Sequence, residues 1–478
     1  MNDAELNSLE WMLGRWLLGG PARTGAPSSW QTATEGLPET EAELRLLALA
    51  GQALQVTAHP RPDSRLFFKP DLPELHLPML EGEARRLYLR SSENTGNKEH
   101  MAQVLRLVAA RGYVVHPLDG MPPGNPDAWP DVYSPWAVWM KGEQIGPCPG
   151  ERITSDNWDV FTPAERNRLL RSLRQADPSA VTDLYAARLA SESLEIRVTL
   201  LAILSVKLGE YDRELLRDFS HDRSARIREI AAHFLARLGE DMPCDDPEEE
   251  LAQYFVRTTT GLFRHRPLFK ARSLKNDAQK KGRTERLTRA SLGRIALALE
   301  TTPAELAAHW QFGETPDVDL LMTQLVGQTS SDELTQLWCE RTLAESEAFS
   351  QLLMAVRERL SAGFRRRVAE KALATGLPLS VAGMWMEGQE GSLPLEALKK
   401  SPHWDTLSDA LSAEIDKGES QKATTAEALF HFGILSDSSA AQARLDQFHS
   451  WRLSGFDIRV TLLQLNAVLS PATTTTNA

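Results

Sequence analysis

The most unusual chemistry in the sequence is a run of basic side chains between Arg257 and Arg294. Twelve lysine and arginine residues stand there against two acidic ones, in a chain whose net charge is −12. A local positive field of this kind suits phosphates or an acidic protein partner, most strongly at low salt. The alternative is a solvated segment that rests against acidic faces of the same chain. The residues of the predicted binding surface are Arg257, Arg264, Arg266, Lys270, Arg272, Lys275, Lys280, Lys281, Arg283 and Arg286.

A DNA-binding helix-turn-helix could follow this basic segment, because the pattern of residues 288–312 indicates two helices joined by a short turn. The second helix, however, offers only His309 and Gln311 as side chains for base edges. Its opening, Thr302-Pro303-Ala304-Glu305, is the same four-residue sequence as Thr162 to Glu165. We therefore interpret residues 288–312 as capped repeat helices. We also expect Gly282 to mark an exposed turn within the basic run.

No motif for catalysis, cofactor binding or metal binding occurs in the sequence. It lacks a G-x-S-x-G elbow, a glycine-rich phosphate loop, an H-E-x-x-H helix and a metal-spaced cluster of histidine and cysteine. Cys148, Cys244 and Cys339 lie far apart and form no disulfide framework. The pair His221-Asp222 falls in a turn between helices, where Asp222 is better explained as a cap. We predict no catalytic residue, no cofactor and no metal, and hence a protein that is not an enzyme.

Residues 113–150 form an irregular segment rich in proline and tryptophan. Its aromatic side chains Trp129, Tyr133, Trp136 and Trp139 could line a ligand pocket or groove. Convergent polar groups are missing from the linear sequence, so packing of these rings onto neighbouring helices is the favoured interpretation.

The elements that would position any surface are short amphipathic helices with clear ends, best seen at 151–240. Pro163 begins one helix, and Asp177-Pro178 stops it and caps the next. We expect a third helix from about Ser193 to Leu208, ended by Gly209 in the left-handed conformation, and a last one ended by Gly239. We expect Gly112 to end the helix of residues 99–111 in the same way.

An internal repeat lies in this stretch. The pattern S-x-x-I-R occurs at Ser193 to Arg197 and again at Ser224 to Arg228, at an offset of 31 residues. Each unit is a pair of helices that cannot bury its apolar side alone, and stacking such pairs gives an α-solenoid. The predicted fold class is therefore all-α, a HEAT-like α-α superhelix.

The segment DRSARIREIAAHFLARL, which begins at Asp222, resembles the second helix of a HEAT repeat. That resemblance implies that Arg228, and by analogy Arg197, bonds an acidic residue or carbonyl of the adjoining repeat; the alternative is two solvated arginines. The A-A-R-G helix end at Ala109 to Gly112, the tryptophan-bearing segment and the R-x-x-L-L-x-x-L-R-x-x-D-P run at Arg166 to Pro178 resemble an uncharacterised bacterial helical-repeat family. That family implies a scaffold beside an AAA+ ATPase and a von Willebrand domain protein.

Composition and chain order complete the prediction. The sequence is 42% hydrophobic and 25% charged, with no secretory signal and no run of membrane-spanning length. We expect a cytoplasmic scaffold or adaptor that binds a protein partner; a nucleic-acid-binding protein using residues 257–294 is the alternative. The predicted regions are an N-terminal helical region 1–150, a repeat pair 151–240, an acidic linker and basic segment 241–300, helical repeats 301–469 and a disordered tail 470–478.

Overall fold

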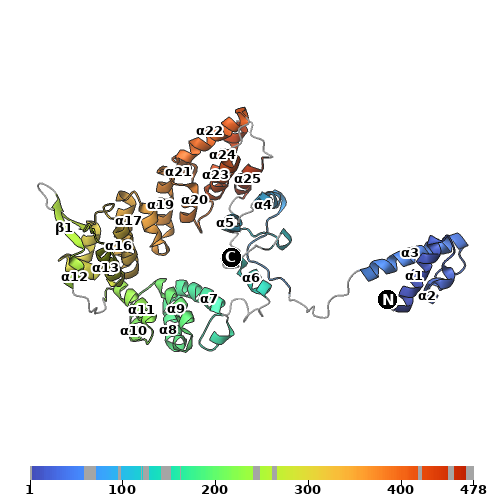
Figure 1. The fold of residues 1–478 in the computed structure, drawn as a ribbon, viewed down its shortest axis with the longest axis horizontal. Coiled ribbons are helices and arrows are strands. Elements are labelled where there is room, and N and C mark those ends of the chain that lie inside the picture. The colour runs from blue at the N-terminus through green and yellow to red at the C-terminus, as the bar shows by residue number, and fades with distance from the viewer. Residues whose placement is uncertain are drawn as a thin grey trace, which may run out of the picture. The chain divides into compact units, whose positions relative to one another are not determined.

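The structure is a computed structural model of the chain, and helices form nearly all of its regular structure (Figure 1). It describes residues 3–58, 71–94, 98–119, 121, 129–141, 152–161, 163–240, 248–260, 266–417, 422–450 and 457–469. This part of the chain confirms the all-α class. Contacts divide the chain into two compact units, Met1–Asp71 and Leu72–Ala478. The boundary falls inside the region predicted as 1–150, and the predicted tail 470–478 lies outside the described residues.

The first unit consists of α1 (Asp3–Leu17), α2 (Ser28–Thr32) and α3 (Glu39–Ala58). Its small core contains Met12 from α1, Leu46 from α3 and two alanines of the connection between α1 and α2. The carboxylate of Glu43 accepts hydrogen bonds from the indole nitrogen of Trp16 at 2.8 Å and from the amide of Ala22 at 3.0 Å. These contacts pack the first helix against the elements that follow it.

The part of the second unit that was predicted to hold the repeats is a series of short helices that contact their neighbours. Its elements are α7 (Pro163–Ala176), α8 (Pro178–Arg188), α9 (Leu194–Leu201), α10 (Arg213–Phe219) and α11 (Ala225–Arg237). Asp177 caps α8 by accepting the Ala180 amide at 3.2 Å, as predicted. Ile196 and Ile227 lie on α9 and α11, which contact each other. Thr162, which precedes α7 as Thr302 precedes α15 in the sequence, lies outside the described residues.

The predicted end of the third helix at Gly209 is wrong. Helix α9 stops at Leu201 and is followed by a 3-10 turn over Ala202–Ser205. Lys207, with φ of 48°, takes the left-handed conformation, whereas Gly209 is extended with φ of −152°. A side chain at Gly209 would clash, because a Cβ there would lie 2.7 Å from the ring of Tyr211. Gly112 and Gly239 do have positive φ, as predicted, at 85° and 81°.

The basic segment contains a β-hairpin that the sequence analysis did not predict. After α12 (Glu248–Ala252), β1 (Phe255–Thr260) pairs antiparallel with β2 (Arg266–Ala271), in a register that sets Phe255 opposite Ala271. The segment continues through α13 (Asp277–Arg289), α14 (Leu292–Ala298) and α15 (Pro303–Ala308). Gly282 lies inside α13, so the predicted exposed turn is wrong. Phe255 and Phe269 are buried on one face of the hairpin, in a core shared with Trp310.

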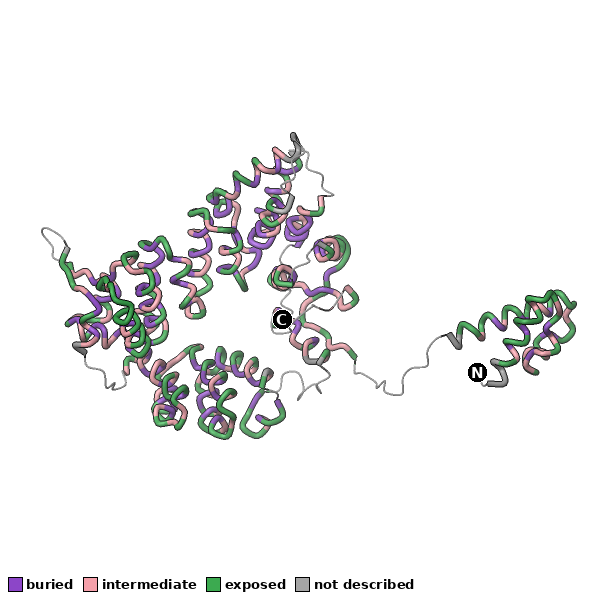
Figure 2. Tube along the Cα trace, in the orientation of Figure 1, coloured by how far each residue is buried: buried purple, intermediate pink, exposed green. Residues whose placement is uncertain are grey.

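The remaining helices follow one another to the end of the described chain. They are α16 (Pro316–Thr329), α17 (Asp332–Glu345), α18 (Phe349–Met354), α19 (Ala362–Ala374), α20 (Leu379–Trp385), α21 (Leu395–Lys399), α22 (Pro402–Lys417), α23 (Lys422–Leu435), α24 (Ser438–Ser450) and α25 (Thr461–Val468). Buried positions alternate with exposed ones along them, and each helix turns its buried side towards its neighbours (Figure 2). Among the described helices, none combines the length and apolarity needed to cross a membrane.

Three helices from the early part of the second unit share a core with the last ones. These are α4 (Gly82–Asn94), α5 (Lys98–Ala110) and α6 (Ser134–Lys141); α4 contacts α25, and α5 contacts α23. Leu107 and Val108 belong to the same buried cluster as Leu462 and Leu465. The rings of Trp129, Tyr133 and Trp136 are also buried there, so these aromatic side chains pack as favoured and do not line an open groove.

Candidate functional site

The two predicted ladder arginines meet at one residue, Asp222, in the turn before α11. Arg197 of α9 forms an ion pair with Asp222, and both side chains are largely buried. Arg228 is exposed and donates to the backbone oxygens of Asp222 and Arg223, at 2.8 and 3.1 Å. Arg197 thus joins its helix to the next helix pair, whereas Arg228 closes its own turn.

Asp222 is held ionised by these contacts. Burial by itself would raise its pKa, but a hydrogen bond from the Ser224 amide and the ion pair with Arg197 lower the pKa below its ordinary value. The expectation that Asp222 serves as a cap agrees with the Ser224 amide bond of 2.8 Å.

A more deeply buried ion pair nearby was missed by the sequence analysis. Arg174 of α7 pairs with Asp212, and neither side chain has any exposed surface. Arg174 also donates to the backbone oxygens of Pro178 and Val206, at 2.7 and 2.8 Å. Asp212 accepts from Thr182 at 2.6 Å. Arg174 belongs to the R-x-x-D-P run at 174–178, so a signal was present, but its partner lies in a turn two helices further on.

The predicted basic surface is partly neutralised within the chain. Arg283 is buried and donates to the backbone oxygen of Arg272 at 2.9 Å, and burial lowers its pKa. Arg286 pairs with Glu250 and Lys270 pairs with Glu314. Arg257 donates to the backbone oxygens of Leu299 and Glu300, and Lys280 and Lys281 have acidic neighbours on α13. Arg266, Arg272 and Lys275 are exposed, and Arg264 lies outside the described residues.

The first unit carries an apolar face that its own core does not use. On α3, Ala42, Leu46 and Ala50 are buried, whereas Leu44, Leu47 and Leu54 on the opposite side are exposed by 62, 51 and 45%. Gly51 lies in line with these leucines, and a Cβ placed there would meet no atom within 4 Å. Trp11, Leu13, Leu17 and Leu18 at α1 are exposed as well. Exposed residues predominate along both helices in Figure 2.

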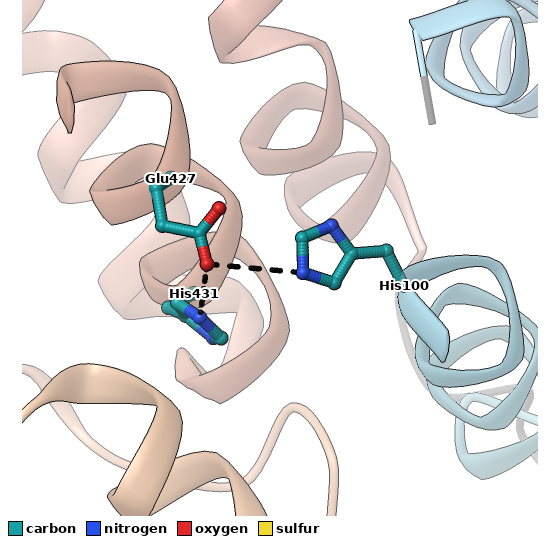
Figure 3. Close-up of side chains that lie close together, drawn as sticks. All are labelled: His100, Glu427 and His431. Atoms are coloured by element: carbon teal, nitrogen blue, oxygen red, sulfur yellow. Dashed lines mark hydrogen bonds and ion pairs between the residues drawn. The ribbon is translucent and has the colours of Figure 1, made fainter. Parts of the chain in front are cut away.

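Two histidines and a glutamate from opposite ends of the second unit come together between α5 and α23 (Figure 3). The Nε2 atom of His431 lies 3.1 Å from a carboxylate oxygen of Glu427, and Nε2 of His100 lies 3.8 Å from the same oxygen. One possible ligand atom from each residue falls within 4.8 Å of the other two. The sequence analysis predicted no metal site and named none of these residues, because His100 is remote from the others in the chain.

Burial and stacking fix the two rings. His431 is only 4% exposed, and its burial lowers the pKa of the imidazole, although Glu427 opposes the shift. The ring of His100 stacks on Phe430, with 4.0 Å between ring centroids. Glu427 is the most accessible of the three, with 57% of its side chain exposed.

Comparison with known families places most of these features in one group of proteins. Residues 134–447 match the family described as a family of unknown function, DUF5691. The chain belongs to this family. No curated protein and no solved structure matches this chain.

The DUF5691 match covers some of the candidate features and leaves others outside. The ion pairs of Arg174 and Arg197, the basic segment and the residues Glu427 and His431 all lie within it. His100 and the apolar face of α3 precede it. The predicted resemblance to an uncharacterised family agrees with this finding, while the HEAT type of the repeats stays a prediction.

Proposed function

We propose that the chain is a non-catalytic helical-repeat scaffold that binds a protein partner through the apolar face of α3. Its frame would be a HEAT-like solenoid, supported by the contacts of α7 to α11 and by the ion pair that links Arg197 to the turn of the next helix pair. In a solenoid each helix pair covers its neighbour and leaves broad outer surfaces for binding. The proposed location is the cytoplasm.

The exposed leucines of α3 are the observation that carries this proposal. Leu44, Leu47 and Leu54 recur at helical spacing on the side away from the core, and such a stripe normally packs against another element. The ordinary outer face of a surface helix is polar, as on the exposed side of α13. A helix that is apolar on two sides is suited to two sets of neighbours.

The chemistry of the first unit indicates the kind of partner. Residues 1–58 contain seven acidic and three basic side chains, so the apolar stripe lies in an acidic surrounding. The matching partner is a protein that offers an amphipathic helix with leucine-like anchors flanked by lysine or arginine. An AAA+ ATPase and a von Willebrand domain protein are the candidates that the family resemblance implies.

Site-specific crosslinking tests this proposal. A photo-reactive amino acid is placed at Leu47, and as a matched control at the exposed Gln52 of the same helix. We expect position 47 to capture one defined protein in cells, and Leu44→Glu to abolish that capture. Purified captured protein should bind the chain, with at least about 10-fold weaker binding to the Leu44→Glu variant.

Two results would contradict the proposal. One is equal capture from positions 47 and 52, which would indicate a nonspecific surface. The other is a second copy of the chain as the captured protein, together with a dimer in light scattering that Leu44→Glu converts to a monomer. Self-association would then explain the exposed leucines.

Nucleic-acid binding through residues 257–294 has less support. Arg283 is buried, and Arg257, Lys270 and Arg286 are engaged by acceptors of the same chain. The exposed Arg266, Arg272 and Lys275 remain available to phosphates. Charge reversal at these three positions would abolish retention of the chain on DNA or RNA if this alternative held, and unchanged retention would exclude them.

A further inference from the structure

The cluster of His100, Glu427 and His431 has a donor set that matches a particular class of metal ion. Two imidazole nitrogens and one carboxylate oxygen suit zinc and its neighbours among the first-row transition metals, whereas calcium and magnesium prefer oxygen ligands throughout. Zinc sites with an exchangeable ligand commonly have three protein ligands of these types and a water molecule in the fourth position.

The spacing of the three side chains is close to that required. In a tetrahedral site with bonds of about 2.0–2.1 Å, neighbouring ligand atoms lie roughly 3.3 Å apart. The separations of 3.1 Å between His431 and Glu427 and 3.8 Å between His100 and Glu427 lie on either side of that value. The three ligand atoms are within 4.8 Å of one another. A small rotation of the His100 side chain, which is 22% exposed, would complete the triangle.

The helices position these ligands before any ion arrives. Glu427 and His431 are four residues apart on α23 and so project from the same face of the helix. His100 projects from the start of α5 towards Glu427 (Figure 3). Its ring stacks on Phe430. Rings that are already partly ordered by packing lose little conformational freedom on binding.

The charge of the donor set also suits a cation. The carboxylate of Glu427 would offset part of the charge of the ion.

We propose that His100, Glu427 and His431 bind one zinc ion, or a first-row transition-metal ion of similar preference, between α5 and α23. The exposure of Glu427 leaves a fourth position open to water. The ion joins a helix from the start of the second unit to one near its end. A hydrogen bond of 2.7 Å from Arg106 to Glu390 is another link between α5 and a later part of the chain. This inference does not depend on the scaffold proposal.

Metal titration of the full-length chain tests the site. The protein is first stripped with a chelator, and zinc chloride is then titrated in by calorimetry, with cobalt chloride in parallel for its visible spectrum. We expect one saturating equivalent, a rise in melting temperature, and a cobalt spectrum of tetrahedral nitrogen and oxygen ligation. His100→Ala and Glu427→Gln should each weaken binding by more than about 100-fold, because even outer ligands of a metal site commonly contribute 10- to 100-fold.

Three controls make the outcome decisive. His449→Ala alters an exposed histidine of α24 and should leave binding unchanged. The titration is repeated with Cys148→Ser and Cys244→Ser together, because thiolates also bind zinc; Cys339 is buried, and burial raises the pKa of its thiol to about 12. Circular dichroism of each variant confirms folding. Absence of saturable binding, or equal binding by the wild type and the His100→Ala and Glu427→Gln variants, would overturn the proposal.

Discussion

Arg174 and Asp212 form an ion pair from which water is excluded. Each has the other as its charge partner, and Arg174 also saturates several backbone oxygens near the ends of α7 and α9. Truncation of the arginine would leave the Asp212 carboxylate buried without a countercharge. We expect Arg174→Ala to lower the free energy of unfolding of the repeat region by about 3–5 kcal/mol. Urea unfolding, with hydrogen exchange in peptides from residues 163–219, measures this loss.

A matched substitution separates the effect of burial from that of charge. Arg188 forms an ion pair with Asp159, whose side chain is 78% exposed. Because exposed pairs contribute little, Arg188→Ala should change the free energy of unfolding by less than about 1 kcal/mol. Equal losses from Arg174→Ala and Arg188→Ala would show that the buried pair has no special role.

His431 gives the chain a defined dependence on pH. Burial lowers its pKa in the folded state below the ordinary value of 6.5, so the unfolded chain takes up a proton first on acidification. Its contribution to stability is therefore complete above pH 6.5 and is lost as the pH falls below that value. In the presence of a chelator, the melting temperature should fall between pH 7 and pH 5 by more in the wild type than in His431→Gln.

The comparison of the wild type with His431→Gln isolates the effect of the His431 ring. His233 is also buried with a lowered pKa and contributes to the pH dependence of both proteins. The neighbouring side chains Glu427 and His100 are also present in both. Identical melting curves across pH 5–7 would mean that His431 is not neutral and buried in the folded chain.

At the scale of the element, helix caps are the features that a sequence predicts well. Thr302 begins α15, and its hydroxyl accepts the Glu305 amide at 3.1 Å, as the Thr-Pro-Ala-Glu motif indicates. We expect Thr302→Ala to cost about 1 kcal/mol in the free energy of unfolding, and Thr302→Ser to cost much less. Chemical denaturation of the two variants measures the difference, and equal losses would show that the methyl group matters more than the cap.

The hairpin of β1 and β2 shows where local reasoning stops. The basic run also contains the apolar residues Phe263 and Phe269, but the charges around them favoured a solvated or phosphate-binding segment. The residues that hold β2 in place are distant in the sequence. Two backbone hydrogen bonds, of 2.8 and 3.0 Å, join Phe269 to the residues on either side of Trp310. No spacing within residues 255–271 reveals that partner.

The cluster of His100, Glu427 and His431 could not be predicted from the sequence for the same reason. The four-residue spacing of Glu427 and His431 is common in helices, and His100 joins them only in the folded chain. Arg197 was predictable because the S-x-x-I-R repeat points to it, and the structure supplies its partner Asp222. Sequence periodicity therefore predicted helices and their caps, while contacts across the chain decided which polar side chains meet.

At the scale of the whole molecule, the chain consists of two units with separate cores. The core of the first contains Met12 and Leu46, and among the described residues no buried cluster of the second includes one before Leu72. We expect a chain that lacks residues 1–71 to keep the melting temperature of the second unit, and to lose the crosslinked partner. A calorimetric scan of the two proteins tests this, and a lowered main transition in the shortened chain would contradict it.

Leu107 of α5 and Leu462 of α25 share one buried cluster, although α5 is made early and α25 near the end of translation. At about 5–20 residues per second, a ribosome takes on the order of tens of seconds to synthesise the sequence between them. Throughout that interval the part of the apolar surface of α5 that α25 and its neighbours cover in the folded chain lacks that cover, so we expect the nascent chain to be a substrate for chaperones that hold apolar segments.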